Sequence, residues 1–271
     1  MAALGALACT WRALRPLHIP RPSGETVAVL AIALAYRLPA LVHPWGWVNT
    51  DGAYGAFVAL HLLEGSRPAP VFTEGANYQG TLKGHIAALL SMATGAQDLS
   101  RLLVVAGVLL GLVFIAATMA LARRIGGRPA AVAAGLYLAL GPKFLTVFSL
   151  NSVGQYVDVL ALGGAALALL APVLRGEDVR SERLRMFAVG GLLGAAFWQQ
   201  PIAVCYVLAA AFALAWRRGE GSVARWTWWA AGLLVGALPV VVWNAGHDWA
   251  TGALFSGGSL RAQAAALPHL V

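Results

Sequence analysis

The sequence predicts an all-α membrane protein, a polytopic helical bundle of about seven spans with juxtamembrane helices on its outer side. Composition is the first reason. Of the 271 residues, 59% are hydrophobic and 11% are charged, whereas soluble globular domains carry about 25% charged residues. The second reason is that the apolar residues occur in long runs, bounded by charges and turn residues, of the length that crosses a bilayer.

The first predicted span is TVAVLAIALAYRLPALV, residues 26–42, in which Arg37 is the one charge. Further apolar runs follow at 102–122, 129–145, 156–174 and 226–243. The run 186–216 is too long for one span, since 31 residues make a helix of about 46 Å against a hydrocarbon core of about 30 Å. Gln199, Gln200 and Pro201 interrupt it near its middle. We therefore predict two short spans there, joined by a tight turn.

The basic residues predict the orientation. With the N-terminus in the cytoplasm and seven spans, the inner segments hold 13 of the 19 basic residues, namely Arg12, Arg15, Arg21, Arg123, Arg124, Arg128, Arg175, Arg180, Arg183, Arg185, Arg217, Arg218 and Arg225. Such a bias is the positive-inside rule of membrane proteins, and it explains the net charge of +8 without a nucleic-acid partner. We expect a bacterial cytoplasmic membrane protein.

The same count of basic residues argues against a further span within the outer segment 43–101. Making TLKGHIAALLSMATG, 81–95, a span would invert every later loop, and this stretch is short and carries Lys83 and His85. We therefore expect it to be an interfacial or re-entrant helix on the outer side. The stretch 53–64 resembles a second such helix, and Asp51 stands at its start, where an Asp can cap the helix.

Three regions follow from this topology: a cytoplasmic tail, 1–25; a transmembrane domain, 26–245, which includes the outer loop 43–101; and the start of a further outer loop, 246–271. The tail has no long apolar core followed by a cleavage site, so we predict no signal peptide. Cys9 lies in the tail and Cys205 in a span, so we predict no disulfide.

Polar residues gather in the predicted outer segments. The cluster GANYQGTLKGH, the loop FSLNSVGQY, the turn WQQP and the segment WNAGHDW all face one compartment. A site built from them would be polar, lined by aromatics and open sideways to lipid, which suits a substrate with a lipid tail and a hydroxylated head group. No zinc spacing and no P-loop are present in the sequence. Asp158 stands just inside its span, buried or reaching back to the outer surface.

These segments together resemble a known family. The segments occur in this order: a first span, an outer loop with Asp51, a helix ending in LLEG, then YQGTLKGHIAALLSMATG, ARRIGGRPAAVAAGLYLALGP, SLNSVGQYVDVLALG, LLGAAFWQQPIAVCYVLAAAFALAW and PVVVWNAGHDWATG. The chain thereby resembles the bacterial branch of the GT-C membrane glycosyltransferases, which are similar to protein mannosyltransferases. The resemblance covers nearly the whole chain, from about residue 28 to 258.

The resemblance implies inverting transfer of a sugar from a polyprenyl-phosphate donor to an acceptor, a glycan, lipid or protein, on the outer face. It implies that Asp51 is the catalytic base. Together with the outer-segment residues it predicts a substrate site of Tyr54, Glu74, Asn77, Tyr78, Gln79, Lys83, Arg101, Asn151, Gln155, Tyr156, Gln199 and Gln200. No cofactor is required by this chemistry; Mg²⁺ or Mn²⁺ would be compatible with it. The partners are the donor and membrane lipids.

Two departures from the family pattern concern the site. Gly52 stands where many members have a second acid, and Lys83 stands where members carry Glu. Two other readings stay open: a lipid or sugar transporter or flippase, and a catalytically silent, truncated relative that acts as a membrane scaffold.

Overall fold

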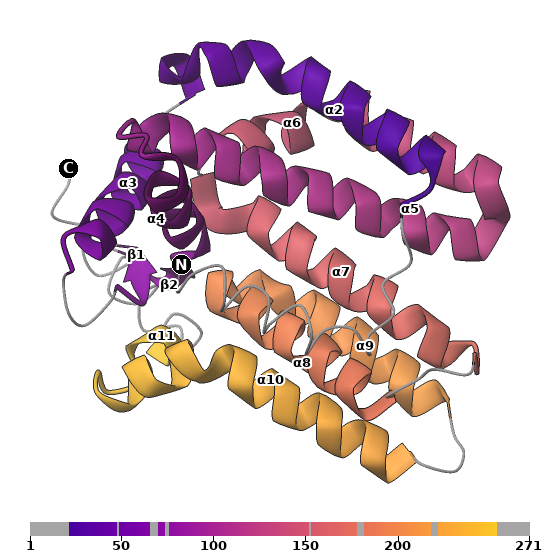
Figure 1. Ribbon diagram of the computed structural model, residues 1–271. Coiled ribbons are helices and arrows are strands. Elements are labelled where there is room, and N and C mark those ends of the chain that lie inside the picture. Colours follow the sequence, from indigo (N-terminus) through magenta and orange to yellow (C-terminus); the bar gives the residue numbers. More distant parts are fainter. Residues whose placement is uncertain are drawn as a thin grey trace, which may run out of the picture.

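The computed structural model describes residues 22–47, 49–65, 70–73, 76–151, 153–177, 182–217 and 222–253. This part of the chain is mostly helical, and its long helices run side by side along one direction (Figure 1). Four of them are long and apolar enough to cross a membrane: Gly24–Val42, Leu99–Leu140, Tyr156–Leu174 and Ser222–Ala245. The described part of the chain is therefore mostly helical, with four helices of the kind that cross a membrane, consistent with the predicted all-α membrane protein. The count of seven spans stays a prediction.

The helix α2, Gly24–Val42, contains the first predicted span, and α7, Tyr156–Leu174, has the predicted bounds. The run 186–216 is divided as predicted. The helix α8, Glu182–Gln199, ends at the polar turn, a short 3₁₀ helix η4, Pro201–Ala203, follows, and α9, Val204–Trp216, returns. The last long helix, α10, is Ser222–Ala245.

Two predicted spans lie within one helical element, α5, Leu99–Leu140, which turns back on itself at a glycine pair. Gly126 and Gly127 leave helical geometry, and Gly127 has a φ of 71°, a left-handed conformation that glycine adopts without strain. A Cβ added to Gly135 would lie 2.6 Å from the sulfur of Met119. The two arms, 99–125 and 128–140, therefore pack against each other as an antiparallel hairpin.

The second arm of α5 is shorter than the predicted span 129–145. The helix ends at Leu140, the break falls at Gly141 and Pro142, and a separate helix α6, Lys143–Leu150, follows. The prediction that helix continues to residue 145 is wrong, because the residue before a proline is disfavoured in helical geometry.

The helices α8 and α10 are parallel and approach closely through glycines on both. A Cβ on Gly190 would lie 2.0 Å from the carbonyl oxygen of Trp229, and one on Gly194 would lie 2.2 Å from that of Leu233. Small residues spaced four apart allow such backbone contact between membrane helices. The connecting helix α9 lies outside this pair, with Leu208, Phe212 and Trp216 exposed.

Arg37, in the middle of the first apolar run, is buried and joins three elements. Its Nε donates to Ser149 Oγ at 2.9 Å, and its Nη1 donates to the carbonyls of Ala33 and Ala139 at 3.0 and 3.1 Å. These bonds fasten α2 to α6 and to the end of the second α5 arm. A buried charge in a span is tolerated when polar groups of the bundle surround it in this way.

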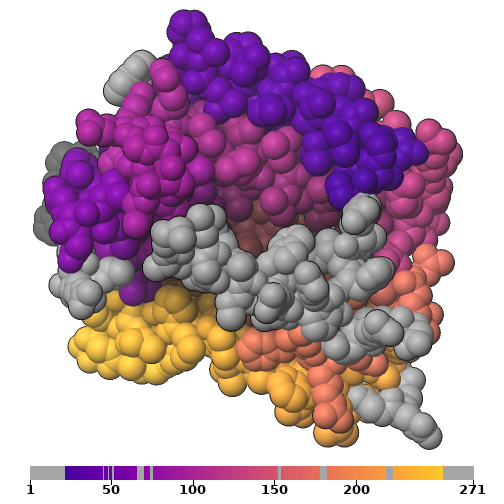
Figure 2. All heavy atoms as spheres, viewed as in Figure 1, coloured from indigo at the N-terminus to yellow at the C-terminus, as the bar shows by residue number. Residues whose placement is uncertain are grey.

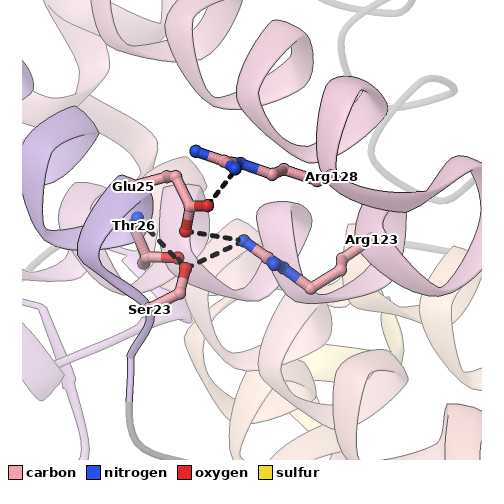
Figure 3. A network of polar contacts seen from close by, with 5 residues as sticks. All are labelled: Ser23, Glu25, Thr26, Arg123 and Arg128. Atoms are coloured by element: carbon pink, nitrogen blue, oxygen red, sulfur yellow. Dashed lines mark hydrogen bonds and ion pairs between the residues drawn. The ribbon is translucent and has the colours of Figure 1, made fainter.

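Most described arginines of the predicted inner segments gather at one end of the bundle. In Figure 3, Glu25 of α2 lies between Arg123 and Arg128 of the α5 turn, at 3.3 and 2.5 Å, and Arg123 also donates to Ser23, which caps α2. Arg124 pairs with Glu177 at 2.5 Å, and Arg225 pairs with Glu182 at 2.6 Å. We call this the basic end.

Shorter elements gather at the opposite end, beside the starts of α5 and α7 (Figure 1): α3, Thr50–Leu63; the hairpin of β1, Phe72–Thr73, and β2, Ala76–Gly80; α4, Leu82–Thr94; and α11, Ala250–Ala253. They come from the predicted outer segments. In the space-filling view, α3 and α4 form the left side, α2 the upper edge and α10 the lower edge (Figure 2). We call the end of the bundle formed by α3, the β1–β2 hairpin, α4 and α11 the polar end. A short 3₁₀ helix, η2, Pro44–Trp47, connects α2 to it.

Candidate functional site

Two glycines allow the elements of the polar end to lie in contact. A Cβ on Gly80 would lie 2.7 Å from both Gln199 Nε2 and the carbonyl oxygen of Trp198, so β2 can pass directly over the end of α8. A Cβ on Gly84 would lie 2.6 Å from Val58, so α4 can pack against α3. These two contacts fix the position of Lys83, which stands between the glycines in sequence.

Lys83 and Asp158 form a buried ion pair. The ammonium lies 3.3 Å from Asp158 Oδ2, and the side chains are 2% and 0% exposed. Lys83 is in the first turn of α4, and Asp158 is in the first turn of α7, where a carboxylate is favoured by the helix dipole. The reading in which Asp158 reaches the outer surface is therefore wrong, because its carboxylate points to Lys83 inside the bundle.

Gln199 caps α4 from another helix. Its Oε1 accepts a hydrogen bond from the backbone N–H of Leu82 at 3.1 Å, while Thr81, the residue before α4, makes no side-chain cap. Beside it, Trp198 Nε1 donates to the carbonyl of Val71 at 2.8 Å. The WQQP turn is thereby bonded to the outer segment 43–101, as expected if the two form one site.

Gln155 is held in an unusual conformation at the start of α7. Its φ is 53° and it follows Gly154, with a φ of 64°. Non-glycine residues in the left-handed region are uncommon, and they are found at functional sites more often than elsewhere. Gln155 is buried, and its Oε1 has no hydrogen-bond partner among the described residues.

Several of the predicted site residues, and Asp158 beside them, have buried polar atoms without a hydrogen-bond partner in the described part of the chain. Among the residues that the structure describes, these atoms include Asn151 Oδ1, Gln155 Oε1, Gln199 Nε2, Gln200 Oε1, Lys83 Nζ and both carboxylate oxygens of Asp158. The Lys83–Asp158 contact is thus a charge pair without an aligned hydrogen bond. Buried polar groups are normally bonded, so each of these atoms has capacity for a further polar ligand or water.

The predicted residues of β2 are placed beside the end of α10. The carbonyl of Asn77 accepts a hydrogen bond from Thr251 Oγ1 at 2.7 Å, and Thr251 and Asn244 bond each other reciprocally at 3.0 Å. Tyr78 and Gln79 are half-buried in the same strand. Asn244 lies in the predicted polar segment WNAGHDW, but neither it nor Thr251 was predicted as a site residue. The signal in the sequence is an Asn in the last turn of an apolar helix.

Other predicted residues are placed less centrally. Tyr156 packs on Phe148, with ring centroids 4.9 Å apart, rather than on the unpartnered polar atoms. Arg101 is half-exposed and lies 3.7 Å from Asp98, its neighbour in the first turn of α5. Leu103 of that helix approaches Gly55, which places the start of α5 beside α3.

Asp51 lies in the first turn of α3, but Asn49 caps that helix: its Oδ1 accepts from the backbone N–H of Gly52 at 2.9 Å. The alternative reading of Asp51 as the helix cap is therefore not met, because Asn49, two residues earlier, has that role. Tyr54, one turn further on, is half-buried. The side chain of Asp51 and the whole of Glu74 lie outside the described residues.

Within the described ranges, no group of three or more His, Cys, Asp or Glu side chains lies in position to hold a metal ion. Asp158, the buried carboxylate of the site, already faces an ammonium group.

In comparisons with known proteins, no family model matches the chain, and neither a curated protein nor a solved structure matches it at a significant level.

Proposed function

We propose that the chain is a membrane glycosyltransferase that moves a sugar from a polyprenyl-phosphate donor to an acceptor at the polar end of the bundle. The observation that carries the proposal is the convergence of segments far apart in sequence. Lys83 from α4, Asp158 from α7 and Gln199 from α8 are joined by the ion pair and the Leu82 cap, and α3, which carries Asp51, packs on α4 through Gly84.

In this proposal, Asp51 takes the proton of the acceptor hydroxyl as its oxygen attacks the anomeric carbon. The new C–O bond forms while the bond from that carbon to the donor phosphate breaks, and the polyprenyl phosphate leaves with the electron pair. A single displacement inverts the anomeric configuration. A positioned base contributes about 10²–10⁴-fold to such a step.

The leaving phosphate needs positive charge nearby. Lys83 and Arg101 are the two candidates that the sequence offers for this charge, and Lys83 faces Asp158 inside the bundle. Arg101 is the better cation for this role, since it stands at the start of α5 beside α3 and, although it lies near Asp98, its side chain is accessible whereas that of Lys83 is buried. In this scheme Lys83 holds α4 against α7.

The test is Asp51→Asn in purified protein reconstituted in lipid, assayed with a panel of polyprenyl-phosphate sugars. We expect the rate to fall at least about 100-fold, the lower bound for a lost general base, with folding intact because Asn49 supplies the cap. Glu64→Gln is the matched control, an exposed acid at the other end of α3. If the wild type is active and the Asp51→Asn variant keeps more than about a tenth of its rate, Asp51 is not the base.

A transporter or flippase is the second candidate, and the buried charges favour it. Arg37 and the Lys83–Asp158 pair are buried in the bundle, and ionisable residues within spans often mark translocation paths. Movement of a labelled lipid-linked sugar across vesicles by the wild type, without transfer, would support this reading. If the wild type shows neither transfer nor movement, the catalytically silent scaffold is the reading that remains.

A further inference from the structure

An apolar groove lies at the basic end, between the last turns of α7 and α9. It has a volume of about 440 Å³ and is lined by Leu174, Phe212, Ala213, Trp216 and Arg217. Phe212 and Trp216 are 68% and 80% exposed, and together with Leu208 they form one face of α9 at helical spacing. In a membrane, this face contacts hydrocarbon.

Arg217 gives the groove a charged rim. It is the C-cap of α9, and a Cβ on Gly176, in the turn after α7, would lie 3.3 Å from its guanidinium. None of the described residues forms an ion pair with Arg217, whereas the described carboxylates at this end are already engaged: Glu25 by Arg123 and Arg128, Glu177 by Arg124, and Glu182 by Arg225. Among the described residues, Arg217 therefore has no carboxylate partner, and its guanidinium can attract an anion.

We propose that this groove binds an anionic phospholipid of the leaflet at the basic end, with the phosphate against Arg217 and an acyl chain along Leu174, Phe212 and Trp216. Basic groups at the membrane surface attract anionic lipid head groups, and pockets between helices on that side select them. Arginine suits a phosphate because its planar fork can donate two parallel hydrogen bonds. Trp216, at the last turn of α9, has the place of an aromatic residue at the membrane interface.

Quenching of Trp216 fluorescence tests the proposal. The protein is placed in nanodiscs of phosphatidylcholine with phosphatidylglycerol, and brominated acyl chains are carried either by the anionic or by the zwitterionic lipid at equal mole fraction. Because the chain has ten tryptophans, the signal of Trp216 is taken as the difference from Trp216→Phe. We expect that quenching to be at least twofold stronger when the bromines are on phosphatidylglycerol.

Substitutions at Arg217 distinguish a specific lipid site from general electrostatic attraction of anionic lipid to the basic end. Arg217→Gln should remove the lipid preference and Arg217→Lys should keep most of it. Arg183→Gln should leave it unchanged, since Arg183 is an exposed arginine of the first turn of α8 that does not line the groove. Equal quenching by both lipids, or equal loss in the Arg183 and Arg217 variants, overturns the proposal. Complete loss of the preference in the presence of inorganic phosphate would also overturn the proposal, because inorganic phosphate has no acyl chain to occupy the groove.

Discussion

The side-chain carbonyl of Gln199 accepts a hydrogen bond from the backbone N–H of Leu82 at 3.1 Å, so the N-terminus of α4 is capped from the end of α8. Gln199 is fully buried, and water cannot replace the lost acceptor easily. We expect Gln199→Ala to lower stability by about 1–2 kcal/mol, the usual effect of losing a cap or leaving a buried donor unsatisfied. Gln200→Ala, which removes no hydrogen bond shown between described side chains, should change it by less than about 0.5 kcal/mol. Unfolding of the two variants by heat or denaturant in detergent decides between these values.

The Lys83–Asp158 pair is expected to behave as a unit. Lys83→Met or Asp158→Leu alone leaves one charge buried without its partner, which destabilises by about 3–5 kcal/mol. The double variant replaces both charges by apolar groups and should lie close to the wild type. A double-mutant cycle measured by the same unfolding assay checks this. Additive losses in the double variant would show that the two side chains are not coupled.

The α8–α10 interface gives a matched pair of neighbouring glycines. A Cβ on Gly190 would lie 2.0 Å from the carbonyl oxygen of Trp229, whereas one on Gly191 would lie 3.8 Å from the carbonyl oxygen of Gly232, the atom nearest to it. Gly190→Ala must therefore separate the helices, and we expect a loss of about 1–3 kcal/mol, as for other overpacked interiors. Gly191→Ala should be neutral or slightly stabilising, since Ala favours helix over Gly. Similar melting temperatures for the two variants would contradict the close contact.

Orientation is testable with single cysteines in a chain whose Cys9 and Cys205 have been replaced. A cysteine at Arg124, at the basic end, should react with a thiol reagent only from the cytoplasmic side. One at Gly95, the exposed residue that ends α4, should react from the outer side. Labelling of Gly95 from the cytoplasm would mean that α4 crosses the bilayer, and the predicted topology would then fail.

Much of the helical framework could be predicted because hydropathy is a property of contiguous residues. The bounds of α7 and the break at Gln199–Pro201 follow from the apolar runs and the turn residues that interrupt them. The error at the end of α5 came from weighting hydropathy over the Gly141–Pro142 break, although that break is also local. The short β hairpin was missed, since its strands are too brief to give a clear alternating pattern.

The candidate site was harder to predict because its contacts are non-local. Lys83, Gln155 and Gln199 were predicted as site residues, yet nothing in the sequence pairs Lys83 with Asp158 or places Gln199 at the start of α4. The N-terminal cap of α3 was also hard to predict, although the residues involved are close in sequence. Asn49 and Asp51 are both good cap residues, and the choice of Asn49 depends on where the chain from η2 enters the helix.

The parallel packing of α8 and α10 has a consequence for the order of assembly during synthesis. The two helices that fit together through their glycines are separated in sequence by α9, so α8 is synthesised before its partner. Until α10 has been made, the glycine-lined surface of α8 lacks the helix that covers it in the folded chain.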